Sequence, residues 1–132
     1  MYKGSCLCGA VKYEVRGELG PAVYYCHCTR CRKSNGSAFA SNAAVTANDF
    51  VIVQGQESLK SFSTAEGVHR MFCSHCGSPI VSRRDGLPDV VRIRLGTLDT
   101  PLRSGPRAHI FVASRADWFE IHDQLPQYPE RP

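Results

Sequence analysis

The sequence contains no apolar run long enough to cross a membrane as a helix, so we do not expect a membrane protein. Its first ten residues also lack the long apolar stretch of a secretory signal, which makes a cytoplasmic protein the expectation. No internal repeat, low-complexity tract or long linker divides the chain. We therefore expect one domain over residues 1–132, with an irregular tail from about residue 123.

Sustained helical periodicity is missing as well, which argues against a helical bundle. The segment 10–15 instead alternates apolar and polar residues, with Val11, Tyr13 and Val15 on one face, as in a half-buried strand. Residues 22–25 read as its return strand. Only residues 29–36 suggest a short helix, with Thr29 as N-cap and Gly36 as terminator. Further strands are expected within 37–45, 50–55, 58–62, 69–73, 79–83, 89–98, 108–112 and 118–122.

The chain has little excess charge once its cysteines are considered. The formal net charge is +4 with neutral thiols. Seven thiolates holding two zinc ions would lower it to about +1. This small net charge does not favour nucleic acid as a partner. The arginines keep nucleic-acid binding open as a hypothesis, and a steep loss of binding with salt would support it.

Seven cysteines are the most informative feature of the composition. An odd number cannot pair completely into disulfides, and a reducing cytoplasm would keep most thiols free. The cysteines occur as C-x-C, C-x-C-x2-C and C-x2-C clusters, each beside a glycine that permits a tight turn. Such spacing indicates zinc binding.

One division uses all seven cysteines. Four of them would close a structural zinc site, and three would hold a second zinc ion with an open, catalytic position. Cys26 and Cys28 could instead join Cys73 and Cys76. The four-thiolate set is Cys6, Cys8, Cys73 and Cys76, and the three-thiolate set is Cys26, Cys28 and Cys31.

The three-thiolate site has other readings. A histidine could close it and make both zinc ions structural, although His27 lies between two ligands and should point away. His69, His75 and His109 remain candidates. An iron–sulfur cluster would be left one ligand short. Three basic residues near Cys31 would stabilise thiolates there, or simply form a solvated helix face; they are Arg30, Arg32 and Lys33.

The chain resembles the glutathione-dependent formaldehyde-activating (GFA) family, also called the centromere protein V/GFA family. Five blocks carry the resemblance: "GSCLCGAVKYEV", "CHCTRCRKSNGSAF", "FCSHCGSPI", "RLGTLD" and "HIFVASRADWFEI". The resemblance implies a mainly β fold of stacked antiparallel sheets with zinc knuckles, called a β-tent. It also implies the same division into structural and catalytic zinc. The implied reaction joins glutathione and formaldehyde to S-hydroxymethylglutathione, a carbon–sulfur lyase reaction in reverse.

This resemblance suggests what the open zinc position is for. It would accept a substrate thiol and lower the pKa of that thiol, so that the thiolate attacks the aldehyde. Arginines could meet the glutathione carboxylates, although solvent-facing strand positions are expected for the candidates Arg70, Arg83, Arg84, Arg92, Arg94, Arg107 and Arg115. A non-catalytic zinc module that binds a protein partner is the alternative. The oligomeric state stays open.

Overall fold

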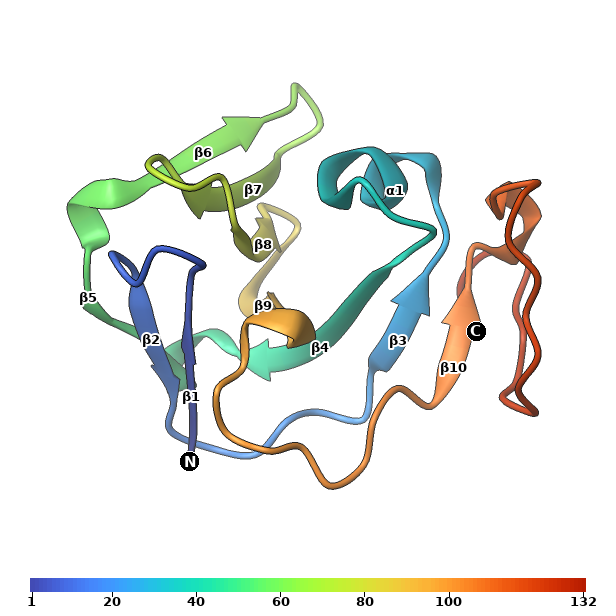
Figure 1. Cartoon of the computed structure of the whole chain (residues 1–132), viewed down its shortest axis with the longest axis horizontal. Coiled ribbons are helices and arrows are strands. Elements are labelled where there is room, and N and C mark those ends of the chain that lie inside the picture. The colour runs from blue at the N-terminus through green and yellow to red at the C-terminus, as the bar shows by residue number, and fades with distance from the viewer.

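The protein consists of short strands in two sheets together with one helix, and the computed structural model describes all residues 1–132. The small sheet has the order β1-β2-β5 and the large one β10-β3-β4-β9-β8-β7-β6 (Figure 1). The strands are β1 (Tyr2–Ser5), β2 (Lys12–Val15), β3 (Val23–Cys26), β4 (Ala40–Thr46), β5 (Phe50–Gln54), β6 (Leu59–Ser63), β7 (Val68–Cys73), β8 (Pro79–Arg84), β9 (Leu87–Arg94) and β10 (Ala108–Ile110). The helix is α1 (Thr29–Asn35), and single 3-10 turns lie at Ala47–Asp49, Gln56–Ser58, Leu95–Thr97 and Val112–Ser114.

The mainly β architecture expected from the sequence is confirmed, and its two sheets pack around a shared apolar core. The three alternating residues of the segment 10–15 are at most 1% exposed, so their predicted common face is buried. Val11, Tyr13 and Val15 belong to the same buried cluster as Val91 and Ile93 of β9 in the other sheet. Removing this apolar surface from water stabilises the stacked arrangement. No helix in the structure has the length and apolar character needed to cross a membrane.

The expected hairpin between residues 10–15 and 22–25 is wrong. β2 pairs with β1 and β5, whereas β3 pairs with β4 and, in parallel, with β10. The turn between β2 and β3 therefore carries the chain from one sheet to the other. Alternation specifies which side chains of a strand are buried, but it does not specify which strand becomes the neighbour.

The segment 118–122 is not a strand, contrary to its aromatic, strand-like composition. The Arg115 guanidinium donates hydrogen bonds to the carbonyl oxygens of Ala116 and Phe119, which hold a compact turn. Trp118 in this turn is 68% exposed. A strand needs a partner edge for its backbone groups, and this turn has none.

The tail beyond residue 123 contains no helix or regular strand, as expected, yet it runs beside β10 (Figure 1). His109 donates its backbone N–H to the Pro126 carbonyl, and Tyr128 donates to the His109 carbonyl, both at 2.9 Å. Phe111 donates to the Glu130 carbonyl at 2.9 Å. These bonds bring the last residues of the chain to the end of β10 where α1 begins.

Candidate metal centres

The first and last cysteine pairs lie together in one group, which we call the four-sulfur group. Its sulfur atoms all lie within 4.8 Å of one another. The Cys6–Cys8 and Cys8–Cys73 sulfur distances are 3.7 and 3.8 Å. Thiolates placed tetrahedrally about 2.3 Å from a zinc ion lie about 3.8 Å apart, so this donor set fits zinc. The group consists of Cys6, Cys8, Cys73 and Cys76.

Two tight turns present these sulfurs. Gly9 and Gly77 follow the second cysteine of each pair and have φ values of 81° and 77°. Glycine adopts this left-handed conformation without a steric penalty. In the second turn, hydrogen bonds from the hydroxyl and the backbone amide of Ser78 lower the pKa of Cys76 to about 5. Cys76 is therefore a thiolate at neutral pH, which is the form that binds zinc.

The other three cysteines converge where β3 leads into α1. Cys26 is the last residue of β3, and Cys31 lies in the first turn of α1. The expected N-cap, Thr29, is wrong: Cys28 occupies this position, and its sulfur accepts a hydrogen bond from the Cys31 backbone N–H at 3.3 Å. An N-cap needs only an acceptor that reaches this amide, and the sulfur provides it. Gly36 ends the helix with φ 62°, as expected.

We call Cys26, Cys28 and Cys31 the three-sulfur group. Their sulfurs lie within 4.8 Å of one another, and no ligand atom of another Cys, His, Asp or Glu joins them. The neighbouring Cys26 and Cys28 thiols, followed by the charges of Arg70 and Arg94, lower the pKa of Cys31, which favours its thiolate form. Three soft donors with no fourth protein ligand fit a zinc ion that keeps one position open.

No histidine closes the three-sulfur group, so this alternative from the sequence is wrong. His27 is fully buried and forms a hydrogen bond with His109. His69 contacts Ser63 and Asp85, and His75 is exposed in the turn that carries the four-sulfur group.

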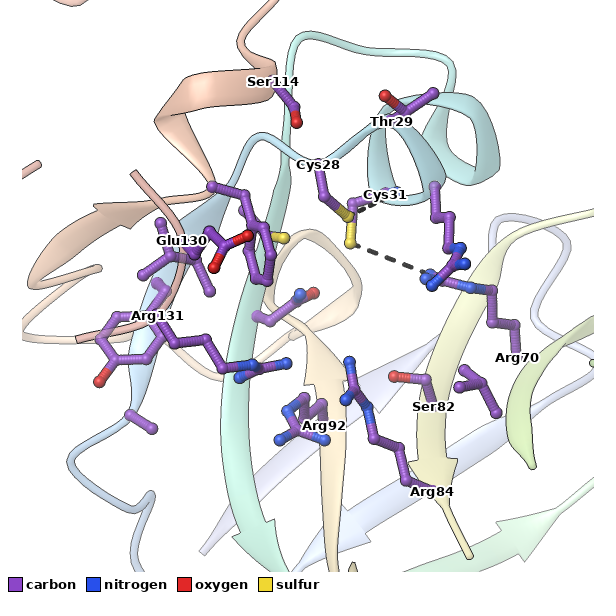
Figure 2. Close-up of a pocket in the computed structure, with 18 of the residues that line it drawn as sticks. Cys28, Thr29, Cys31, Arg70, Ser82, Arg84, Arg92, Ser114, Glu130 and Arg131 are labelled. Carbon is purple, nitrogen blue, oxygen red and sulfur yellow. Dashed lines mark hydrogen bonds between the residues drawn. The ribbon is translucent and has the colours of Figure 1, made fainter. Parts of the chain in front are cut away.

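A cavity of about 340 Å³ opens beside the three sulfurs, and Figure 2 shows the side chains that point into it. Six arginines line this cavity, which we call the arginine cavity. Glu130 is the only carboxylate among its lining residues. None of the six lies within 4.0 Å of a carboxylate oxygen. The arginines are Arg30, Arg70, Arg84, Arg92, Arg94 and Arg131.

Solvent-facing positions were expected for the strand arginines, and this is wrong for Arg70, Arg92 and Arg94, which line the cavity and are partly or fully buried. The polar face of β9, opposite Val91 and Ile93, faces the arginine cavity, whose other walls include residues of α1 and the C-terminal tail. Alternation along a strand cannot distinguish a face covered in this way from one that meets open water. Four are exposed, as expected, although one of them, Arg84, also lines the cavity; the four are Arg83, Arg84, Arg107 and Arg115.

Arg94 is the most unusual of these arginines because it is only 4% exposed. Its Nη1 donates to the Arg92 carbonyl at 3.3 Å, and its Nε has no hydrogen-bond partner. Burial lowers the pKa of Arg94 to about 10, so the side chain is still a cation at neutral pH. Three thiolates with a divalent ion carry one net negative charge, and a buried cation next to them offsets that charge.

A hydrogen-bonded chain runs from exposed Asp123 through the buried His109 to the buried His27, which lies between two cysteines of the three-sulfur group. Asp123 is an acceptor, so His109 Nε2–H donates to it at 2.9 Å. His109 Nδ1 then accepts from His27 Nε2–H at 2.8 Å. Burial, followed by the nearby His109, lowers the pKa of His27 to about 4, which keeps it neutral as this chain requires. The sequence offered no signal for this pairing, because His27 and Asp123 lie far apart along the chain.

We expect Asp123→Ala to destabilise the fold at neutral pH. The hydrogen bond from His109 lowers the pKa of the Asp123 carboxyl below its ordinary 3.8. A lowered folded-state pKa stabilises the fold above the ordinary value, and this contribution is lost as the pH falls through the lowered value. Urea unfolding should therefore show the two proteins diverging at pH 7 and converging once the pH falls below the lowered pKa of Asp123. The exposed Asp117→Ala is the control, and equal stability of all three proteins at pH 7 would contradict the expectation.

Comparisons with known proteins show the family of this chain. Residues 1–114 match the family described as "Glutathione-dependent formaldehyde-activating enzyme". A Halomonas elongata protein named "Putative glutathione-dependent formaldehyde-activating enzyme" is 30% identical, over 94% of this chain and 83% of the relative. A crystal structure of a Rhodobacter sphaeroides protein has a TM-score of 0.62 and 28% identity, and it covers 79% of this chain and 97% of that one. This chain, with its two cysteine groups, belongs to the glutathione-dependent formaldehyde-activating family.

Proposed function

We propose that this protein is a carbon–sulfur lyase that forms and cleaves thiol–aldehyde adducts. S-hydroxymethylglutathione, made from glutathione and formaldehyde, is the proposed adduct because both compounds occur in the family's name. Residues 1–132 would form one zinc-binding domain of this family. The observation that carries the proposal is the three-sulfur group, which faces the arginine cavity without a fourth protein ligand.

The two cysteine groups would have separate roles. Cys6, Cys8, Cys73 and Cys76 would hold a structural zinc ion, and Cys26, Cys28 and Cys31 a catalytic one. The chemistry that the second zinc ion supplies when bound is Lewis acidity, which lowers the pKa of a substrate thiol and polarises an aldehyde.

The residues around the cavity set the conditions for this chemistry. In the reaction the thiol adds across the C=O bond: a sulfur–carbon bond forms, and the thiol proton ends on the former carbonyl oxygen. No electrons are gained or lost, so no redox partner is needed. The lining contains no histidine or lysine that could act as a nucleophile or a base. The protein contributes by holding both reactants together in a positively charged cavity.

Arg70 is placed to stabilise negative charge on the three-sulfur group. Its Nη1 lies 4.0 Å from the Cys31 sulfur (Figure 2). The same Nη1 lies 3.4 Å from the Ser34 hydroxyl. Ser34 lies one turn beyond Cys31 in α1. The hydrogen bond from Arg70 to Ser34 therefore also connects β7 to the helix. A fixed guanidinium beside a thiolate stabilises the deprotonated sulfur.

The direct test is exchange NMR with 13C-formaldehyde and glutathione, on zinc-loaded protein. We expect the exchange between free formaldehyde and S-hydroxymethylglutathione to be faster than the uncatalysed exchange. Protein from which zinc has been removed should give no acceleration. A protein with two zinc ions that leaves the exchange rate unchanged would contradict the proposal and favour the non-catalytic zinc module instead.

A further inference from the structure

The C-terminal tail places one arginine, Arg131, in the arginine cavity, and this residue lies outside the part of the chain that matches the family. That match covers residues 1–114, and Arg131 lies beyond it. The backbone bonds of Phe111 and Val112 to the tail, at 2.9 and 3.0 Å, fix this part of the chain against the end of β10. The Arg131 guanidinium carbon then lies 5.5 Å from the centre of the Phe111 ring, where a cation–π contact holds it.

Arg131 does not stand alone. Figure 2 shows the side chains of Arg84, Arg92 and Arg131 pointing into the same cavity from β8, β9 and the tail. None of the three has a carboxylate partner. Burial and the charge of Arg131 both lower the pKa of Arg84 and of Arg92. Three guanidinium groups that repel one another in one cavity form a site in which an anion would relieve the repulsion.

We propose that the C-terminal tail is part of the substrate site, where Arg131 joins Arg84 and Arg92 to bind a carboxylate of the thiol substrate. The inference rests on the proposed function, because it takes the thiol at the three-sulfur group as the substrate. Guanidinium groups match the two oxygens of a carboxylate. They leave the nearby sulfurs free for the thiol end of the same molecule.

The charge next to Arg131 favours an amino-acid group over a phosphate. Glu130 also lines the cavity and is its only acidic residue. An amino-acid group carries an ammonium and a carboxylate on the same carbon atom, which suits the opposite charges of Glu130 and Arg131. A phosphate would meet the arginines but would be repelled by Glu130.

A thiol-blocked probe tests the subsite separately from catalysis. S-methylglutathione keeps both carboxylates but has no free thiol, so its binding to the zinc-loaded protein does not depend on the reaction. We expect calorimetry to show that the probe binds about tenfold more weakly to Arg131→Gln. A tenfold change is the lower end of the effect of losing one hydrogen bond to a charged group, which suits an exposed side chain. The dimethyl ester of the probe, whose carboxylates are blocked, should bind weakly to both proteins.

Two controls separate the outcomes. Arg103→Gln removes an exposed arginine outside the cavity and should bind the probe as the unaltered protein does. S-methyl-coenzyme A is a thiol-blocked probe that carries phosphates in place of the two carboxylates. The proposal is overturned if S-methylglutathione does not bind, if its binding ignores Arg131→Gln, or if only the coenzyme A probe depends on Arg131. Probe binding that depends on Arg131 in a protein without exchange activity would overturn the proposed function but keep the subsite.

Discussion

Replacing Cys73 by serine is expected to unfold the protein. Cys73 is fully buried at the end of β7 and belongs to the four-sulfur group, which joins this strand to the N-terminal turn. Zinc in such a site contributes an apparent binding free energy of about 10–16 kcal/mol at pH 7. A domain of this kind is stable by only about 5–15 kcal/mol. Losing the zinc ion therefore removes an amount comparable to the whole stability.

The Cys73 prediction can be checked by circular dichroism and by zinc content. Cys73→Ser should lack a cooperative thermal transition and should hold at most a weakly bound zinc ion. A chelator strong enough to remove both zinc ions should unfold the unaltered protein in the same way. A Cys73→Ser protein that melts within a few degrees of the unaltered protein would contradict a structural role for this group.

Cys28→Ser is expected to abolish activity while leaving the fold intact. Serine is a strong N-cap, so its hydroxyl can replace the Cys28 sulfur as the acceptor for the Cys31 amide. It is a poor ligand for zinc, because a serine oxygen is harder than a thiolate and is protonated at neutral pH. The loss of several kcal/mol of charge stabilisation predicts a fall in the exchange rate of at least about a hundredfold.

Native mass spectrometry under anaerobic conditions is the measurement for Cys28→Ser. The unaltered protein should carry two zinc ions per chain, and Cys28→Ser should carry one with an unchanged melting temperature. Thr29→Ala is the matched control one residue along the chain, since Thr29 does not cap the helix, and it should keep both ions. A single zinc ion in the unaltered protein, even after reconstitution with zinc, would contradict the catalytic site.

The Cys73 and Cys28 predictions rest on the cysteine groups and on the N-cap of α1, and the sequence predicted the first of these features but not the second. The glycine-flanked cysteine clusters are local patterns, and they led to the division into four and three that the sulfur positions show. The caps of α1 are also local features, but the sequence prediction chose Thr29 as the N-cap instead of its neighbour Cys28. A cysteine was not expected as an N-cap, and the extended backbone of Cys28 places its sulfur within reach of the Cys31 amide.

The sequence by itself determined which cysteines group together and which face of each strand is apolar, because cysteine spacing and alternation act over a few residues. Only the tertiary structure decided that β2 and β3 lie in different sheets, that Arg94 is buried, and that Arg131 enters the cavity. Alternation marks the face of β9 that carries Arg94 as polar. Whether that face meets water or a covered cavity depends on α1 and the tail, which pack there through contacts between residues distant in the chain.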